Sequence, residues 1–157
     1  IKTRGLLSKA SMRYMSQFEP FITSYDCRFV HGFPPDSPLT YMFQVSEGRK
    51  QEVFNKMAER MCFIGHTHTL EIIGYDGKDI QHAELPKGLS RLDPKKKYII
   101  NIGSVGQPRD SSNNAKYVIW DSVEDSLDVR FLSYDIASVV QKIKVAGLPQ
   151  EHARRLW

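Results

Sequence analysis

The sequence predicts one α/β domain with a mixed sheet, covering residues 1–157. Helical and strand-like segments alternate in the first half of the chain, whereas strands joined by tight turns dominate the second half. No repeat, low-complexity tract or linker divides the chain. With 157 residues, 41% of them hydrophobic and 25% charged, the chain is long enough and apolar enough to form one core.

Apolar periodicity and turn residues place the elements of the first half. Ser8 or Ser11 is suited to begin the first helix, and Pro20 ends it. The first strand delivers His31 to its carboxyl end, and a proline-rich turn follows. The expected elements are a helix over residues 7–18, a strand over 25–30, a helix over 51–61 and a strand over 61–64.

The second half is expected to contain two hairpins and two terminal helices. Asp76-Gly77 is typical of a tight hairpin turn, and Gly147 with Pro149 separates the two helices. A glycine-rich turn over residues 103–110 follows a further strand. The expected strands are residues 70–75, 80–85, 98–102, 116–120 and 127–132, and the expected helices are residues 136–146 and 150–156.

Charge and cysteine usage limit the classes of partner and compartment. The net charge is +4 and the pI is about 9.1, but the only basic clusters, Arg49-Lys50 and residues 95–97, sit beside turns. A nucleic-acid partner is therefore not expected. No apolar run reaches the ~20 residues of a membrane helix, and no signal-peptide pattern is present. Cys27 and Cys62 are expected to be buried free thiols, which favours the cytoplasm.

Two histidines one residue apart, His66 and His68, follow the strand over residues 61–64. In an extended backbone, residues i and i+2 point to the same side, so two neutral imidazoles would face one locality. This is a common way to bind zinc, iron, nickel or copper. A lone His-x-His pair also occurs by chance in many globular proteins, so the rest of the chain must decide.

Unusual polar content appears at three separate strand ends. His31 follows one strand, Gly65-His66-Thr67-His68 follows another, and the turn over residues 103–110 follows a third. In α/β proteins the loops at the carboxyl ends of strands bind ligands. Three histidines beside an anion-binding glycine turn make a combined metal and phosphate site chemically sensible.

These segments resemble a known family. Val30-His31-Gly32, residues 63–68 (Phe-Ile-Gly-His-Thr-His) and residues 101–110 (Asn-Ile-Gly-Ser-Val-Gly-Gln-Pro-Arg-Asp) resemble, in order and spacing, the last three motifs of calcineurin-like metallophosphoesterases. Residues 134–136 and 146–149 look like the C-terminus of bacterial and archaeal members. The resemblance covers nearly the whole chain. It implies the C-terminal part of a metallophosphoesterase β-sandwich flanked by helices, with a mixed sheet.

The resemblance also implies a metal centre and a reaction. His31 and His66 match ligands of one metal, and His68 matches a ligand of a second. The metals in the family are often manganese, iron, zinc or nickel, bridged by a carboxylate and a water-derived nucleophile. The implied activity is hydrolysis of a phosphate monoester or diester, with a phosphorylated substrate as partner.

The motifs of the family's first half are absent from this sequence. It contains no Asp-x-His, no Gly-Asp and no Gly-Asn-His. We therefore expect the chain to be the C-terminal half of such an enzyme and to be inactive alone, because histidines supply no negative charge to hold two dications together. We expect it to associate with the N-terminal half or with a second copy. The alternative is a non-catalytic scaffold or interaction protein that keeps the fold; a nuclease fits less well.

Several other polar residues have competing interpretations. Arg109 is suited to pair with a substrate phosphate, or to form a salt bridge with Asp110 or Asp121. The remaining candidates are expected to have structural roles only, with turn-stabilising roles for Asn101 and Ser104 and a surface position for His82 and His152.

Overall fold

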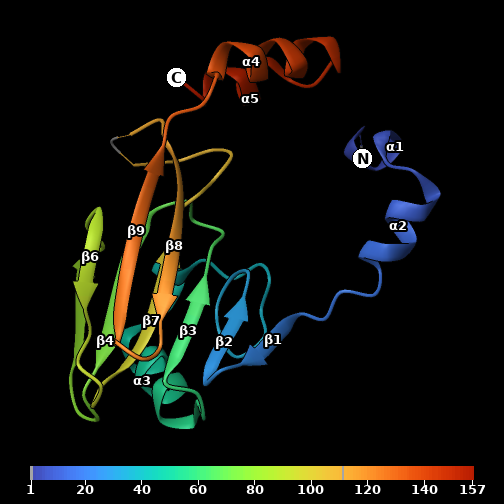
Figure 1. Cartoon of the computed structure of the whole chain (residues 1–157). Coiled ribbons are helices and arrows are strands. Elements are labelled where there is room, and N and C mark those ends of the chain that lie inside the picture. The colour runs from blue at the N-terminus through green and yellow to red at the C-terminus, as the bar shows by residue number, and fades with distance from the viewer. Residues whose placement is uncertain (1, 111) are drawn as a thin grey trace.

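A six-stranded mixed sheet lies at the centre of the structure (Figure 1). The computed structural model describes residues 2–110 and 112–157, and within them the strand order of this sheet is β1-β2-β3-β7-β4-β5. The strands are β1 (Phe21–Ser24), β2 (Cys27–Val30), β3 (Met61–Ile64), β4 (Leu70–Tyr75), β5 (Ile80–Glu84) and β7 (Lys97–Ile102).

Strand direction in this sheet follows from the connections. β2, β3 and β7 are neighbours and run parallel, so their carboxyl ends meet at one edge. The hairpin partners β1 and β5 and the strand β4 pair antiparallel with their neighbours. All four residues of β3 are buried, as expected for a strand covered on both faces. The predicted mixed sheet is confirmed.

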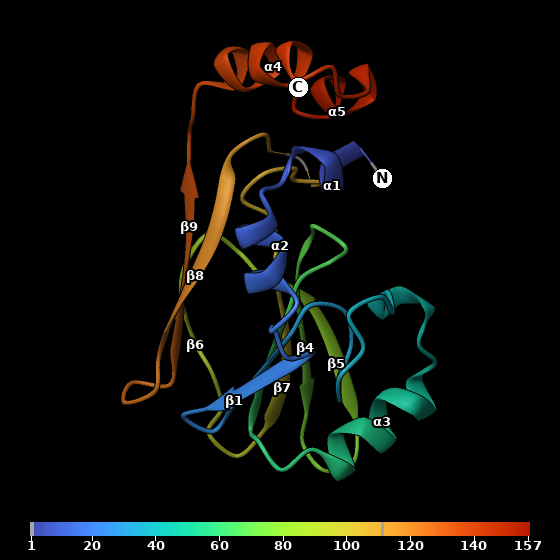
Figure 2. The same cartoon turned by 90° about the vertical axis from the view of Figure 1, so that its right-hand side faces the viewer.

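A smaller sheet covers one face of the central sheet. Its order among the described residues is β6 (Gly88–Arg91), β9 (Ser126–Leu132) and β8 (Ala115–Asp121), all antiparallel. Figure 2 shows this sheet on one side of the central strands and the helix α3 on the other. The core between the sheets consists of Cys27, Met61, Phe63, Leu85, Tyr98, Ile100, Leu127 and Val129. The predicted β-sandwich with flanking helices is therefore confirmed.

Helix α3 (Glu47–Lys56) covers the opposite face of the central sheet. It begins after Ser46, whose hydroxyl accepts a hydrogen bond from the backbone N–H of Arg49 at 3.3 Å. The expected helix over residues 51–61 therefore starts and ends too late. The core on this face consists of Val30, Phe33, Met42, Val53, Phe54, Met57, Cys62, Ile64, Ile73, Tyr75 and Ile99.

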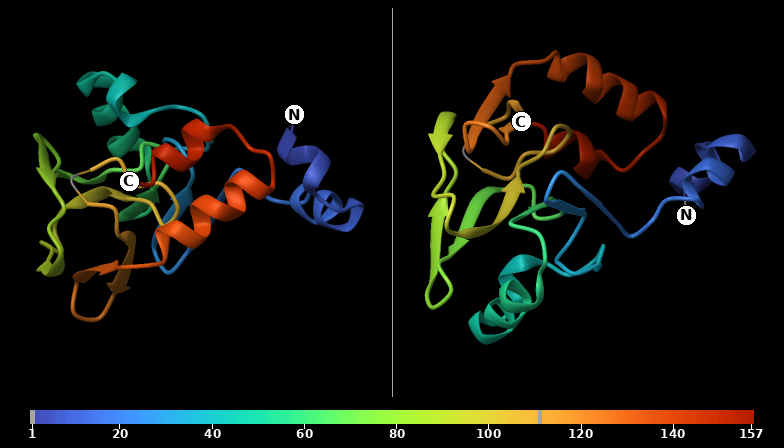
Figure 3. Two further views of the ribbon diagram at one scale, coloured as in Figure 1. Left: turned by 90° about the horizontal axis from the view of Figure 1, so that it is seen from above. Right: turned by 60° about the horizontal axis from the view of Figure 1, so that its bottom comes forward.

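Helices at both ends of the chain lie beyond the sheets (Figures 1 and 3). Only α2 (Lys9–Met15) falls within the expected helix over residues 7–18, and a separate helix that was not expected, α1 (Lys2–Leu6), precedes it. The break between the two helices falls at Ser8, which is the N-cap of α2 and accepts from the N–H of Ser11 at 3.0 Å. The terminal helices α4 (Ile136–Val145) and α5 (Gln150–Arg154) lie at the same end of the molecule as the gold loop after β7.

The structure bears on the expected state of the two cysteines and on the expected absence of a membrane helix. Cys27 and Cys62 are both buried free thiols, as expected. Burial raises the pKa of Cys62 to about 12, so its thiol is protonated and unreactive at neutral pH. Among the described residues, no helix has the length and apolar character needed to cross a membrane.

Candidate metal centre and phosphate site

The three parallel strands end side by side, and the predicted site residues follow each of them. His31 comes directly after β2, Gly65-His66 directly after β3, and Gly103 directly after β7. Because β3 pairs in parallel with both β2 and β7, the loops that bear these residues leave the sheet at one edge. The fold therefore brings three distant segments of the sequence together.

His31 and His66 face each other at this edge. Nε2 of His31 lies 3.2 Å from Nδ1 of His66, and the ring centroids are 5.0 Å apart. On its other side, Nε2 of His66 lies 3.1 Å from the carbonyl oxygen of Leu39. A carbonyl can only accept, so a neutral His66 bears its proton on Nε2 and directs the lone pair of Nδ1 toward His31.

The separation of the two nitrogens fits two ligands of one tetrahedral cation. Zinc–nitrogen bonds of about 2.0–2.1 Å at the tetrahedral angle place two ligand nitrogens about 3.3 Å apart. The observed distance between His31 and His66 is 3.2 Å. Burial, followed by the nearby His66 and His68, lowers the pKa of His31, which favours the neutral imidazole that metals bind. Without a cation, the same distance accommodates an N–H···N hydrogen bond from His31.

His68 is oriented differently from His66. Both residues have left-handed backbones, with φ of 66° and 65°, and the segment is not extended as the sequence interpretation assumed. Nδ1 of His68 lies 2.6 Å from the carbonyl oxygen of Gln107, a contact in which only the histidine can donate. A neutral His68 therefore presents an unprotonated Nε2, the usual state of a metal-ligating histidine with a carbonyl partner.

The glycine-rich turn after β7 is fixed to the histidine loop. The backbone N–H of Arg109 donates to the carbonyl of His68 at 3.1 Å, alongside the contact with Gln107. Within the turn, the hydroxyl of Ser104 accepts from the N–H of Gln107 at 3.0 Å. Gly103 adopts a φ of 76°, which suits glycine. The turn therefore orients His68, and the turn-stabilising role expected for Ser104 is confirmed.

Asn101 forms hydrogen bonds with both the histidine loop after β3 and the glycine-rich turn after β7. It is fully buried at the end of β7, where its Nδ2 donates to the hydroxyl of Thr67 and its Oδ1 accepts from the N–H of Gly103 at 3.3 Å. A buried amide of this kind is stable only when it is hydrogen-bonded. Its predicted structural role is confirmed.

Lys116, which the sequence analysis overlooked, binds the C-terminal part of the loop after β7. Its side chain is wholly buried, and its Nζ lies 2.6 Å from Oδ1 of Asp110. It also donates to the carbonyls of Ser112 and Asn114, at 2.9 and 3.3 Å. A lysine inside an otherwise apolar strand pattern was the available signal, because a buried ammonium requires partners.

Tyr41 was also overlooked as part of the site. Its ring stacks on His66 with centroids 4.1 Å apart, and it belongs to the same loop as Leu39. This loop joins β2 to α3, and its proline-rich sequence gives no chemical signal of its contact with His66. The tyrosine and the carbonyl together fix the orientation of the His66 ring.

Arg109 makes no side-chain ion pair with any described residue. Asp110, one of its two expected partners, is bound to Lys116. Asp121, the other, accepts from the backbone N–H groups of Val123 and Glu124, at 2.9 and 3.0 Å. The salt-bridge alternative for Arg109 is therefore not realised, and its guanidinium is available to a ligand.

The described ligands do not form a complete metal centre. Within residues 2–110 and 112–157, no group of three or more His, Cys, Asp or Glu side chains could hold a metal ion. His31 and His66 form a pair, and His68 is directed to Gln107. The assignment of all three histidines as metal ligands stays a prediction. The other two histidines, His82 and His152, are exposed, as expected.

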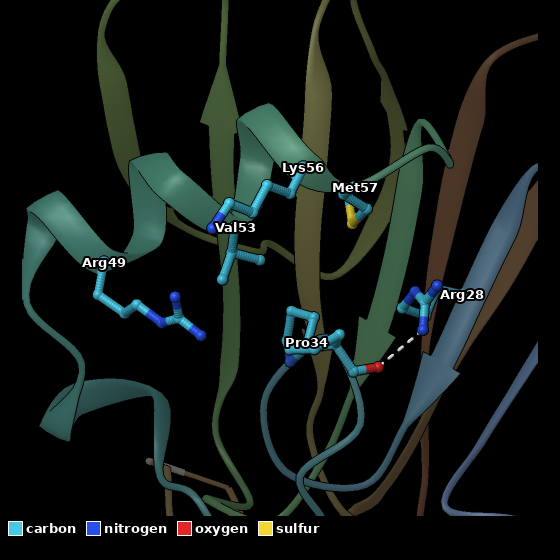
Figure 4. Close-up of a pocket in the computed structure, with 7 residues that line it drawn as sticks. Arg28, Pro34, Arg49, Val53, Lys56 and Met57 are labelled. Carbon is cyan, nitrogen blue, oxygen red and sulfur yellow. Dashed lines mark hydrogen bonds between the residues drawn. The ribbon is translucent and has the colours of Figure 1, made fainter.

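A separate cavity lies on the α3 face, away from the histidines (Figure 4). It encloses about 120 Å³ between Pro34, Val53 and Met57. Arg28 on its wall already donates to the carbonyl of Pro35 at 2.8 Å and forms an ion pair with Glu59 at 3.0 Å. This arginine is therefore structural, in contrast to Arg109.

Comparison with known proteins identifies the fold. Over 96% of its length, the chain superposes on a metallophosphoesterase from Sphaerobacter thermophilus, with a TM-score of 0.82 and 25% sequence identity. The chain has a metallophosphoesterase fold. The hypothetical protein PH1004 from Pyrococcus horikoshii OT3 also matches, with a TM-score of 0.68 over 94% of the chain and 13% identity, and so shares the fold.

Sequence comparison adds one relative without a known function. The uncharacterised protein MJ0912 of Methanocaldococcus jannaschii is 37% identical over 97 residues, which are 62% of this chain and 38% of that protein. No protein-family model matches the sequence. The chain spans only 62% of the Sphaerobacter metallophosphoesterase and 54% of the Pyrococcus protein, so it corresponds to part of each.

Proposed function

We propose that this chain is part of a metal-dependent phosphoesterase that hydrolyses a phosphate monoester or diester. The observation that supports this most is the 3.2 Å approach of His31 to His66 at the carboxyl ends of parallel strands, in a chain with a metallophosphoesterase fold. Neutral imidazoles in this arrangement suit manganese, iron, zinc or nickel. The bound metals would supply an acidified water and stabilise charge on the phosphoryl oxygens.

The histidines have separate roles in this proposal. His31 and His66 would bind one cation, and His68 would bind a second through its free Nε2. The Leu39 carbonyl and the Tyr41 ring keep His66 in place, and the Gln107 carbonyl fixes the tautomer of His68. Arg109, which has no acidic partner in the described part of the chain, would bind a phosphate oxygen.

We further propose that the bridging carboxylate is supplied by residues outside this sequence. Neutral histidines contribute no negative charge, and two dications a few ångströms apart repel each other strongly without it. The absence of Asp-x-His and Gly-Asp motifs supports this proposal, as does the partial coverage of the Sphaerobacter protein. The 157 residues alone would then form a C-terminal half-site without catalytic turnover.

A groove at the open side of the sandwich is the proposed contact with that missing segment. It has a volume of about 490 Å³ and lies between the β2–β3 side of the large sheet and β8 of the small sheet. β8 is an edge strand, so its outer edge has no partner strand among the described residues. We propose that a strand of the absent part of the fold covers it. The groove is lined by Tyr25, Cys27, Phe29, Phe63, Ile102, Val118, Trp120 and Ser122.

Metal content tests the ligand assignment. The purified chain is loaded with Zn²⁺ or Mn²⁺, dialysed and assayed by elemental analysis. His31→Ala and His66→Ala should each lower metal affinity at least tenfold, because each loses an imidazole ligand of the one cation that the isolated chain can hold. His152→Ala on α5 is the matched control and should bind like the unsubstituted chain. Unchanged metal content in the His31 and His66 variants would reject the ligand assignment and favour the scaffold alternative.

Hydrolysis assays test the half-site. We expect no measurable turnover of p-nitrophenyl phosphate or bis(p-nitrophenyl) phosphate by the 157-residue chain with added Mn²⁺. Robust turnover that is lost in His66→Ala would show that the chain alone is a complete phosphoesterase and would refute the proposal of external carboxylates.

Light scattering tests the groove. The uncovered apolar surface should cause the isolated chain to associate with a second copy as its concentration rises. Val118→Lys in the groove should reduce this association, whereas Val123→Lys in the exposed β8–β9 turn should not. A strictly monomeric chain at all concentrations would count against an uncovered interface.

The free buried thiols of Cys27 and Cys62 lead us to propose the cytoplasm as the compartment of this protein.

A further inference from the structure

A polar surface cavity, open to solvent, lies beside His68, between the glycine-rich turn and the C-terminal end of the chain. Its volume is about 370 Å³, and it is lined by Gln107, Pro108, Arg109 and Arg155. This is roughly ten times the ~30 Å³ that a water molecule occupies in the liquid, so it is large enough for more than a single ion. Two arginines from distant parts of the chain therefore meet at one cavity.

The position of Arg155 is fixed by the packing of the chain end. Ala153 and Leu156, on either side of it, are buried. The side-chain amide of Asn113 donates to the carbonyl of Trp157 at 2.7 Å, which ties the chain end to the loop after β7. Figure 3 shows α5 lying close to that gold loop. Arg155 is thus presented by a docked element rather than by a free tail.

Neither arginine has a carboxylate partner in the described part of the chain. Asp110, the acidic residue next to Arg109, is bound by Lys116. Guanidinium groups stay charged at all physiological pH values, so two of them at one cavity make it positively charged and suited to an anion. Phosphate oxygens, like carboxylate oxygens, can accept two parallel hydrogen bonds from the forked donors of arginine, and the histidine site beside this cavity favours phosphate.

We infer that Arg155 and Arg109 together bind a phosphate group of the substrate, which makes the C-terminal helix part of the substrate site. The inference rests on the proposed phosphoesterase function. The carbonyl of Gln107 on the cavity wall accepts from His68 at 2.6 Å, and the N–H of Arg109 donates to the His68 carbonyl at 3.1 Å. The cavity is therefore directly adjacent to the histidine site.

This adjacency defines a class of substrate. One phosphate would react at the histidines while a second is bound by the arginine pair, so the substrate contains at least two linked phosphate groups. A diphosphate or polyphosphate compound meets this requirement, whereas a simple phosphomonoester leaves the arginine pair without its anion. Arg155 is accordingly a specificity-determining residue.

Calorimetric titration of the metal-free 157-residue chain with inorganic pyrophosphate tests the inference without any catalysis. Arg155→Gln and Arg109→Gln should each weaken pyrophosphate binding about tenfold. Arg154→Gln is the matched control: it removes the same charge from the neighbouring residue, but Arg154 lines a different cavity with Val140 and Trp157. Equal weakening by Arg154→Gln and Arg155→Gln would show nonspecific charge attraction and overturn the inference.

Two further measurements sharpen the outcome. With Mn²⁺ added, pyrophosphate should bind at least tenfold more tightly than orthophosphate, because only pyrophosphate can reach the metal-loaded histidines and the arginine pair together; equal binding would overturn the assigned substrate class. Arg155→Lys keeps the charge but loses the paired N–H donors of the guanidinium, so it should bind pyrophosphate with intermediate affinity. Circular dichroism should show unchanged folding in every variant. Because the arginine variants are compared in metal-free protein, those results are independent of the metal-content test with His31→Ala and His66→Ala, so the two proposals fail separately.

Discussion

The two faces of the central sheet differ in how completely this chain covers them. On the α3 face, Phe54, Ile73 and Ile99 are wholly buried, and α3 lies over this face of the sheet. On the sandwich face, Ile100 and Leu127 are equally buried, but the groove along β2 and β8 leaves Phe29 42% exposed. The same sheet is thus closed on one side and partly open on the other.

The difference indicates which faces of the sheet this chain covers with its own residues. A complete apolar layer needs no partner, whereas an edge strand beside an apolar groove exposes both unpaired backbone groups and apolar area. The histidine edge follows the same division. Its hydrogen bonds to Leu39 and Gln107 are made within the chain, but no carboxylate among the described residues joins the histidines in a group of three metal-ligating side chains.

The largest expected effect comes from a matched pair of truncations on the two faces. Phe54→Ala should destabilise the chain by about 3–5 kcal/mol, because it leaves a cavity in the closed layer. Phe29→Ala should cost about 1 kcal/mol or less, since Phe29 is exposed along the groove and its ring stacks on Phe63. Urea denaturation at low protein concentration measures both.

The outcome of this pair bears directly on the groove. Comparable losses in the two variants would mean that Phe29 is buried in solution and that the sandwich face is already covered. Repeating Phe29→Ala at high protein concentration separates coverage by a second copy from coverage by this chain, because only the former depends on concentration.

The next largest loss of stability is expected at Lys116, which binds the turn after β7 to the small sheet. Lys116→Met should cost about 3 kcal/mol, because it removes a buried ammonium that binds Asp110 and two loop carbonyls. Lys95→Met, at an exposed turn, is the control and should change the free energy of unfolding little. If both substitutions were neutral, the turn after β7 would not depend on the buried lysine.

Most of the fold was predictable from the sequence because apolar period and turn residues agree along the chain. The parallel strands and both hairpins lie close to where they were expected. The errors fall where the pattern is weak. Residues 47–49 of α3 are not apolar, and the Ser46 cap was the better signal for its start. β1 (Phe21–Ser24) and β6 (Gly88–Arg91) are too short to give a period, and neither was expected.

The site was less predictable because it depends on the sign of the backbone φ angle at two histidines and on contacts between residues that are distant in the sequence. His66 and His68 were expected to point together from an extended segment, yet both have positive φ, a conformation that histidine tolerates and that its sequence does not reveal. The contacts of His66 with Leu39 and Tyr41 arise only from tertiary packing. Arg155 was overlooked for the same reason.

The smallest expected effect is a pH dependence on the closed face, at the Arg28–Glu59 ion pair. Burial alone would raise the pKa of Glu59, but its backbone hydrogen bond and the Arg28 guanidinium outweigh this, so the pKa lies below its ordinary value of 4.5. The unfolded chain therefore binds this proton first, and the stabilisation is present above pH 4.5 and lost as the pH falls through the lowered folded-state value. Glu59→Gln should reduce stability by about 1 kcal/mol or less at pH 7, and the difference from the unsubstituted chain should shrink toward pH 3. Urea denaturation of both chains across this range measures it. A difference that stays constant from pH 7 to pH 3 would mean that Glu59 is held by packing and not by its charge.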